Sequence, residues 1–166
     1  ISNTFFSWGW ESQGLFKKII PVGKLNKIKS IKNKKKTKFL IITTSYPRYS
    51  HQMSSYPLSS NWIDYFEDQC RFVEQLDKSI LENTIVRTSK QNYGWDEHKR
   101  WKLKFPKLEI DLGQNHIRHK LSASKLCIST YNATSFLETI SLNIPTIIFW
   151  NPNYFERRES SNIFFE

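Results

Sequence analysis

From residue 39 onward, short apolar runs alternate with amphipathic stretches. Residues 39–44 read FLIITT and are bounded by lysines before them and by Ser45, Tyr46 and Pro47 after them. A continuous apolar run of this length predicts a strand that is buried on both faces. Similar runs predict four further strands, at residues 84–87, 108–111, 125–130 and 145–150.

The stretches between these runs predict helices. Residues 60–80 place apolar side chains at steps of three and four, which is typical of a helix with one buried face. We predict a short helix over residues 116–122 and another over residues 133–142. In the polar stretch between the strands at residues 84–87 and 108–111, which contains residues 93–96, we expect a loop with one helical turn. In the helix after residue 133, the side chains expected to face the core are Phe136, Leu137, Ile140 and, just beyond it, Ile144.

This alternation of strand and helix predicts the fold class. Apolar strands separated by helices indicate a parallel sheet with helices on both faces, which is an α/β, three-layer, Rossmann-like domain. The composition agrees: 39% of the residues are hydrophobic and 15% are aromatic, enough to build a core in a chain of 166 residues. A disordered chain, a collagen, a coiled coil and a disulfide scaffold are excluded. Cys70 and Cys127 lie in apolar surroundings and are expected to be reduced, buried thiols.

Composition divides the chain into three zones. Residues 1–23 are aromatic and nearly neutral, residues 24–38 contain eight lysines among fifteen positions, and residues 39–166 carry the α/β pattern. We interpret these zones as the end of an N-terminal domain, a solvated linker and a Rossmann-like donor-binding domain. The lysine run also fits a basic patch for phosphates, acidic lipid or nucleic acid, and the net charge of the chain is +10.

No apolar run approaches the length that spans a bilayer, and the chain has neither a starting Met nor a signal-peptide layout. We therefore expect a cytoplasmic protein. The abrupt start and end of the sequence lead us to expect a fragment of a longer, C-terminally truncated protein.

Candidate chemistry gathers where the predicted strands end, because open parallel sheets bind ligands beyond the carboxyl ends of their strands. This rim contains Arg48, Arg87, Asn132, Thr134 and Ser135, and almost no carboxylates. Arginine forks and the free amides of a helix start suit a phosphate-bearing ligand. The alternatives are that the hydroxyls only cap helices and that Arg87 only extends to water.

Other kinds of site have little support. His116 and His119 are three residues apart without a partner at metal-ligand spacing, so we expect no metal site. His116 is either an exposed surface residue or a phosphate donor or proton carrier. Nucleophile elbows, Gly-x-Gly-x-x-Gly and the P-loop motif are absent from the sequence.

Residues 129–149 combine a strand, a small polar turn, a helix that carries Glu138, and a turn with Pro145 that leads into the next strand. This segment resembles the nucleotide-sugar signature in the C-terminal half of glycosyltransferases with two Rossmann domains, the GT-B architecture. The chain looks most similar to bacterial surface-carbohydrate transferases and is distantly similar to the glycerophosphotransferases that build teichoic acids. The resemblance covers about residues 5–166, with further support at residues 20–24, 86–87, 93–96 and 151–158.

The resemblance implies roles for particular residues. Glu138 would bind the ribose hydroxyls of a nucleotide-activated donor, and Thr134 and Ser135 would lie at its diphosphate. We add Arg48 and Asn132 to this donor-binding set. Arg87 would match the cationic position near the leaving phosphates, and with His116 it forms the expected catalytic pair. The turn departs from its glycine-rich relatives at residues 131–133, which read Tyr-Asn-Ala.

The implied function is transfer of a sugar or polyol-phosphate group in surface polysaccharide biosynthesis, without a cofactor or a divalent metal. The acceptor would be a carbohydrate or a lipid-linked carbohydrate. In such enzymes the acceptor site and the general base lie on the N-terminal domain, so we expect the chain alone to bind donor weakly and to catalyse little. Residues 24–38 would contact anionic lipid at the inner face of the plasma membrane.

Two rival interpretations stay open. A basic, non-enzymatic nucleic-acid or anion-binding α/β domain would also show a +10 charge, a lysine run and many aromatic residues. However, most aromatic residues fall at core-periodic positions and the lysines cluster in one linker, so we expect no specific nucleic-acid partner. The other alternative is a degenerate α/β domain without activity.

Overall fold

The computed structural model describes residues 4–7, 18–22, 36–49, 59–155 and 159–164. The chain splits into two compact units, Ile1–Ser30 and Ile31–Glu166. In the first unit, β1 (Thr4–Ser7) and β2 (Lys18–Pro21) pair in parallel. Most of the lysine run lies outside the described residues, so the three zones inferred from composition stay a prediction.

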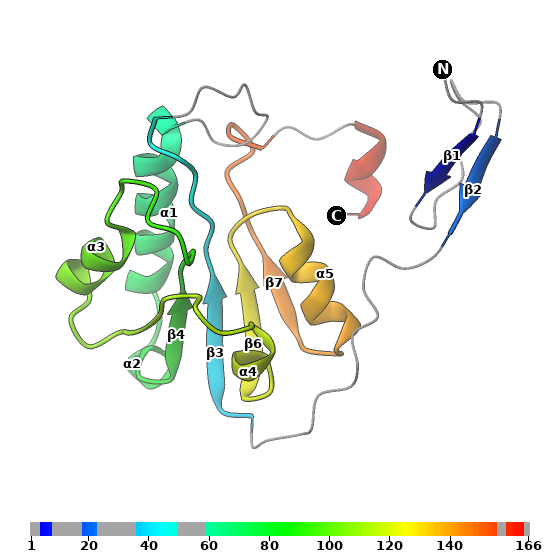
Figure 1. Ribbon diagram of the computed structural model, residues 1–166. Helices are drawn as coiled ribbons and strands as arrows, with labels where there is room; N and C mark the ends of the chain where they lie inside the picture. The colour runs from blue at the N-terminus through cyan, green and yellow to red at the C-terminus, as the bar shows by residue number, and fades with distance from the viewer. Residues whose placement is uncertain (1–3, 8–17, 23–35, 50–58, 156–158, 165–166) are drawn as a thin grey trace. The chain divides into compact units, whose positions relative to one another are not determined.

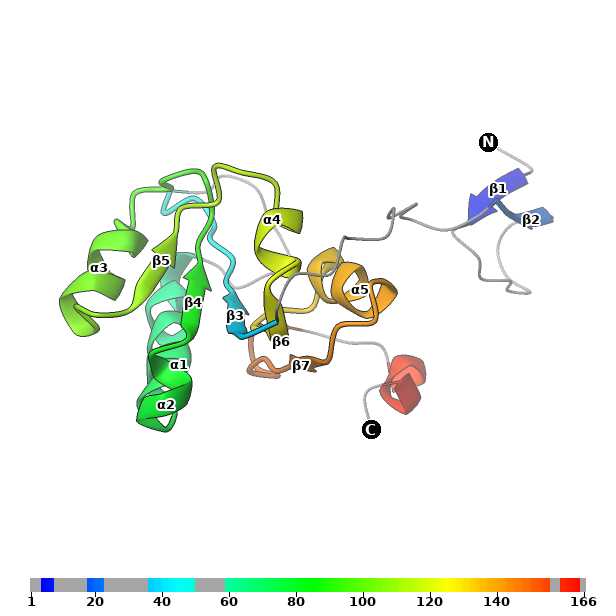
Figure 2. The same cartoon turned by 90° about the horizontal axis from the view of Figure 1, so that it is seen from below.

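The second unit contains a five-stranded, fully parallel sheet in the order β5-β4-β3-β6-β7 (Figures 1 and 2). Its strands are β3 (Lys38–Ile42), β4 (Thr84–Arg87), β5 (Glu109–Asp111), β6 (Ser124–Ser129) and β7 (Thr146–Ile148). All five strands predicted from apolar runs are present. The central strand β3 is the most apolar, because it has a paired neighbour on either side and a packed layer on each face.

Helices cover both faces of this sheet. The α-helices are α1 (Trp62–Glu74), α2 (Lys78–Leu81), α3 (Glu97–Lys104), α4 (Arg118–Leu121) and α5 (Thr134–Ser141), and two 3₁₀ helices, η1 (Ser59–Asn61) and η2 (Glu159–Phe164), complete the described elements. Figure 2 shows α1 and α5 on opposite faces of the sheet. The predicted α/β, three-layer, Rossmann-like fold is confirmed.

Two separate cores hold the layers together. On the face of α1 and α3, Ile41, Val86 and Ile128 of the sheet pack against Trp62 and Trp101. On the opposite face, the core consists of Leu40, Ile42, Ile85, Leu121, Cys127 and Ile144. Alternate residues of β3 thus enter different cores, as the two-residue period of a strand requires.

The prediction for the buried face of α5 was wrong. Leu137 is 43% exposed and Ile140 is 58% exposed, whereas Ser135 and Thr139 are buried. The Thr139 hydroxyl donates to the carbonyl of Phe136 at 2.7 Å and also lies 2.7 Å from the hydroxyl of Thr146, which donates to it. These bonds satisfy the hydroxyl of Thr139, so this side chain can be buried against the sheet. Because the side chain is small, the backbone of α5 packs close to the sheet. Ile144 is buried, as expected.

The segment after residue 93 also differs from its prediction. In place of one helical turn, α3 continues for eight residues, although its sequence, EHKRWKLK, is mostly charged. Trp101 is completely buried and anchors this helix, while Leu103 is 83% exposed. One large apolar anchor therefore holds a helix whose hydrophobic pattern is too weak to predict it.

Both cysteines are free and buried, as predicted. Burial raises the pKa of Cys70 and of Cys127 to about 12, which keeps both thiols protonated. Within the described residues, no helix is long and apolar enough to cross a membrane, and no cluster of three or more His, Cys, Asp or Glu side chains is arranged to hold a metal ion.

Candidate functional site

The topology places a crevice between β3 and β6. The chain runs from β3 outward to β4 and β5 and then returns to β6, on the other side of β3. The connections that leave the carboxyl ends of β3 and β6 therefore diverge to opposite faces of the sheet. In open α/β sheets, such a switch point is where ligands bind.

A buried tyrosine fixes both sides of this switch point. The hydroxyl of Tyr65, in α1, lies 2.6 Å from the hydroxyl of Thr130, directly after β6. It also accepts a hydrogen bond of 2.9 Å from the backbone amide of Thr44, after β3. Burial raises the pKa of Tyr65 well above its usual value, so the phenol stays neutral. The starts of both loops are thus held in place.

A cleft of about 320 Å³ opens at the carboxyl ends of β3, β4 and β6, and we call it the switch-point cleft. Four of the seven predicted site residues line it: Arg87, Thr134, Ser135 and Glu138. They come from two elements, β4 and α5, that are separated in sequence by about fifty residues. The tertiary structure therefore brings together the cation, the hydroxyls and the carboxylate that the sequence assigned to one ligand.

The start of α5 forms one wall of the switch-point cleft. Ala133 occupies the N-cap position and has no side-chain oxygen to accept a hydrogen bond from the first-turn amides. Thr134 is exposed, and the hydroxyl of Ser135 lies 3.3 Å from that of Ser129. Glu138 follows Thr134 by four residues, so both lie on the same side of the helix, and Glu138 is half-buried. This wall combines amide and hydroxyl donors with one carboxylate.

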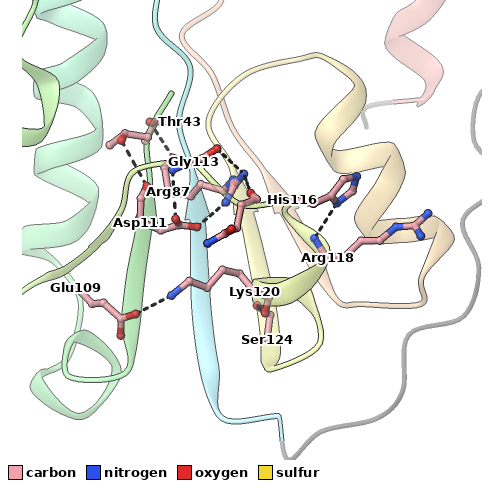
Figure 3. A network of polar contacts seen from close by, with 11 residues as sticks. Thr43, Arg87, Glu109, Asp111, Gly113, His116, Arg118, Lys120 and Ser124 are labelled. Carbon is pink, nitrogen blue, oxygen red and sulfur yellow. Dashed lines mark hydrogen bonds and ion pairs between the residues drawn. The ribbon is translucent and has the colours of Figure 1, made fainter. Parts of the chain in front are cut away.

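Arg87 forms the opposite wall and is held by the end of β5 (Figure 3). Its guanidinium is paired with Asp111 at 2.5 Å and donates to the carbonyls of Asn115, at 2.7 Å, and Gly113, at 3.4 Å. The side chain is only 13% exposed. These contacts use at most three of its five N–H groups, so the guanidinium keeps donors for a ligand in the cleft.

Gly113 allows the loop to pass close to the end of β4. Its φ is +67°, and a Cβ at this position would lie 2.7 Å from the carbonyl oxygen of Thr88. The amide of Gly113 also donates a hydrogen bond of 3.2 Å to the carboxylate of Asp111. Only glycine fits this turn, which aligns Asp111 with Arg87.

Three predicted site residues lie outside this cleft. Arg48 is exposed, and its guanidinium stacks on Trp95 at 5.3 Å and on Tyr49 at 5.7 Å. His116 is exposed, and its Nδ1 accepts the backbone amide of Arg118 at 3.2 Å (Figure 3). Asn132 is half-buried in the turn before α5. The roles that the resemblance gives these three residues stay predictions.

A second cleft, of about 310 Å³, adjoins the first, and we call it the Glu97 cleft. Thr88, Ser89 and Lys90 line both clefts. Glu97, in the first turn of α3, is 8% exposed and accepts hydrogen bonds from the hydroxyl of Thr43, at 2.7 Å, and from the indole of Trp101, at 3.4 Å. Burial raises the pKa of Glu97 to about 7, although these two bonds lower it.

The sequence did not point to Glu97, Thr43 or Tyr65. A glutamate that begins a charged segment is normally exposed, and nothing in the local pattern shows that Trp101 draws this one inward. One signal for Glu97 was available in the sequence. Glu97 lies two residues after Trp95, in the segment that follows the hydroxyl-containing end of a predicted strand.

One family model matches the whole chain, residues 1–166, and its description is LIC12162 family transferase. No curated protein and no solved structure matches the chain.

Proposed function

The chain belongs to the LIC12162 family of transferases, and from this membership we propose that the switch-point cleft binds the nucleotide-activated donor of a glycosyltransferase-type reaction. The transferred group is a sugar or a polyol phosphate. The acceptor is a carbohydrate or a lipid-linked carbohydrate, in the biosynthesis of surface polysaccharide, and the architecture of the complete enzyme is GT-B.

The observation that carries this proposal is the convergence of Glu138, Thr134 and Arg87 on one cleft at the switch point. A carboxylate accepts hydrogen bonds from both hydroxyls of a ribose, which a purely anion-binding site has no need to do. A helix start with free amides favours a diphosphate, because the amides donate hydrogen bonds and the helix dipole is positive there. The spacing of one helical turn between Thr134 and Glu138 matches the order of phosphate and ribose along a nucleotide.

In this assignment, Arg87 stabilises the negative charge that develops on the leaving phosphate. Its pairing with Asp111 holds the guanidinium in place before the donor binds. Preorganised donors of this kind stabilise a leaving group without a metal ion. The tight turn at Gly113 holds the Arg87 wall of the cleft, and the Tyr65 hydroxyl joins the loops that follow β3 and β6.

The proposal is tested by isothermal titration of the chain with nucleoside diphosphates, nucleoside monophosphates and single-stranded DNA. We expect one nucleoside diphosphate to bind selectively. Glu138→Ala removes two charge-assisted hydrogen bonds and is expected to weaken binding about tenfold or more. The matched control is Glu82→Ala, which removes an exposed carboxylate at the opposite, amino end of β4.

Neutralising Lys34, Lys35 and Lys36 should leave nucleotide binding unchanged. If DNA binds with a steep salt dependence and nucleotides bind without selectivity, the non-enzymatic anion binder replaces the transferase. If Glu138→Ala and Glu82→Ala bind the nucleotide equally well, the site assignment is wrong.

A further inference from the structure

Glu97 is a buried carboxylate that forms no ion pair with any described residue. Both of its assigned hydrogen bonds, from Thr43 and Trp101, go to the same oxygen, Oε1. Buried carboxylates are ordinarily paired with a cation, because desolvation of an unpaired charge is costly. The ionised groups that line the same cleft, Lys90, Asp96 and Lys99, are all exposed. An unpaired carboxylate in a cleft is typical of functional sites.

The cleft around Glu97 is lined mainly by neutral hydrogen-bonding groups. Its walls include the hydroxyls of Ser45, Thr88 and Ser89 and the amides of Gln91, Asn92 and Gln114. The buried indole of Trp95 also lines it, and this ring is held by a 2.8 Å hydrogen bond from its Nε1 to the carbonyl of Tyr46. Hydroxyls and amides both donate and accept hydrogen bonds, as the hydroxyls of a carbohydrate do, whereas the ring of Trp95 is already stacked on Trp62 and covered by the guanidinium of Arg48. This lining suits a polyhydroxylated ligand rather than an anion.

The Glu97 cleft and the switch-point cleft are neighbours along the carboxyl edge of the sheet. The segment from Thr88 to Lys90 separates them and lines both. Thr43 lines the switch-point cleft, and its hydroxyl donates directly to Glu97. A group bound beside Glu97 is therefore next to a ligand bound at Arg87 and Glu138.

We propose that the Glu97 cleft is the acceptor subsite: it binds a hydroxyl-bearing carbohydrate group, and Glu97 accepts the proton of the hydroxyl that attacks the donor. This proposal rests on the proposed function of the neighbouring cleft. It places acceptor contacts and the proton acceptor on this chain, whereas the family resemblance placed both on the N-terminal domain.

The chemical step balances without a further reactant. The oxygen of the acceptor hydroxyl forms a bond to the electrophilic atom of the transferred group. The bond from that atom to the nucleotide phosphate breaks, and its electron pair goes to the phosphate oxygen beside Arg87. The proton of the acceptor hydroxyl goes to the carboxylate of Glu97, which later releases it to solvent.

The surroundings of Glu97 suit this exchange of a proton. A base works best when its pKa lies near the working pH, and burial places that of Glu97 at about 7. The groups that face it are the hydroxyl of Thr43 after β3, the indole of Trp101 on α3 and the neutral phenol of Tyr65 on α1, while Lys90, Tyr93, Asp96, His98 and Lys99 line the cleft itself.

Nuclear magnetic resonance of the isotopically labelled full chain tests the proposal. The first probe is the nucleoside diphosphate selected by calorimetry, and the second is a panel of free monosaccharides together with glycerol. We expect the nucleotide to shift the amide signals of Ser135 and Glu138. We expect at least one monosaccharide to shift the signals of Gln91, Asn92 and Gln114 and to move the carboxyl signal of Glu97, which Glu97→Gln identifies by its disappearance.

The two probes separate the two proposals. If the nucleotide binds at α5 but no member of the panel perturbs Gln91, Asn92 or Gln114, the acceptor subsite is wrong and the donor site stands. If the monosaccharide shifts appear but no nucleotide perturbs α5, the donor assignment fails and the carbohydrate site stands. A Glu97 carboxyl that titrates at the usual value for glutamate overturns its role as proton acceptor, and the signal that is missing in Glu97→Gln shows which titration belongs to Glu97.

Discussion

The hydroxyl of Tyr65 lies 2.6 Å from the hydroxyl of Thr130 and also accepts a hydrogen bond from the backbone amide of Thr44. One phenol from α1 therefore joins the loop after β6 to the loop after β3. We expect Tyr65→Phe to lower the free energy of unfolding by roughly 1–3 kcal/mol, because the Thr44 amide loses its partner in a buried site. Thr130 keeps its hydrogen bond to the carbonyl of Ile42.

Chemical denaturation measures this change. The control is Tyr49→Phe, because Tyr49 is 82% exposed and its hydroxyl can bond to water. Nucleotide affinity should fall in Tyr65→Phe as well, since the phenol no longer joins the loops that follow β3 and β6 at the switch point. Equal stability of the two variants would mean that the phenol does not hold the switch point together.

Variants of Arg87 and Asp111 test whether Arg87 binds the ligand or only stabilises the fold. Arg87→Gln and Asp111→Asn each break the same partly buried ion pair, and both should lower the midpoint of thermal unfolding. Arg87→Gln should weaken nucleoside diphosphate binding by about tenfold, because this variant loses the phosphate donor. Asp111→Asn keeps the guanidinium and loses only the carboxylate that holds it in place, so its affinity should fall by less. If neither variant changes the affinity, Arg87 has no part in the donor site.

Glu97 should make the stability of the protein depend on pH. Its pKa is raised from 4.5 to about 7 in the folded state, so the folded chain holds a proton that the unfolded chain has already lost between these values. The contribution of this group to stability is therefore full below about pH 4.5 and declines as the pH rises to about 7, by up to roughly 3 kcal/mol.

Glu97→Gln keeps an oxygen for Thr43 and Trp101 but does not titrate. Its free energy of unfolding relative to the native chain should therefore increase from pH 5 to about pH 7 and then level off toward pH 8. Denaturation curves across that range measure the difference. A constant difference between the two proteins would show that Glu97 titrates at its usual value in the folded state.

Gly113 and Gly94 form a matched pair of glycines with positive φ. An alanine at Gly113 would clash with the carbonyl of Thr88 at 2.7 Å, whereas an alanine at Gly94 would meet only the side chain of Arg48 at 3.5 Å. Both variants carry the backbone strain of a positive φ, about 1 kcal/mol. Any further decrease in the free energy of unfolding of Gly113→Ala therefore measures the clash with Thr88. We expect Gly113→Ala to unfold at the lower denaturant concentration. The reverse order would show that the turn after β5 can shift without cost.

The fold could be predicted from the sequence because its strands are continuous apolar runs. Residues 39–44, between charge and a polar turn, have few alternatives to a buried central strand. The convergence of Arg87 with Thr134 and Ser135 followed from the same reasoning, since parallel strands end at one edge of the sheet, whereas Glu138 came from the family resemblance. The buried face of α5 could not be predicted in this way, because periodicity favoured Leu137 and Ile140. The side chain buried in their place is Thr139, whose hydroxyl forms hydrogen bonds with a helix carbonyl and with Thr146.

Other features of the site depend on contacts between distant segments. Glu97 is buried because Trp101 docks into the core, and its partner Thr43 lies 54 residues earlier in the chain. Similarly, the ring on which the guanidinium of Arg48 stacks, Trp95, comes from a distant segment, and the role of Arg48 as a phosphate ligand stays a prediction. Local pattern does not specify such pairings, so a charged residue at a strand end has several possible partners.

The position of the bound donor is tested most directly by a crystal structure of the chain with its selected nucleoside diphosphate. We predict the ribose hydroxyls on the carboxylate of Glu138 and the diphosphate between the start of α5 and the guanidinium of Arg87. A nucleotide bound elsewhere on the chain, with Glu138 and Thr134 untouched, would contradict the account.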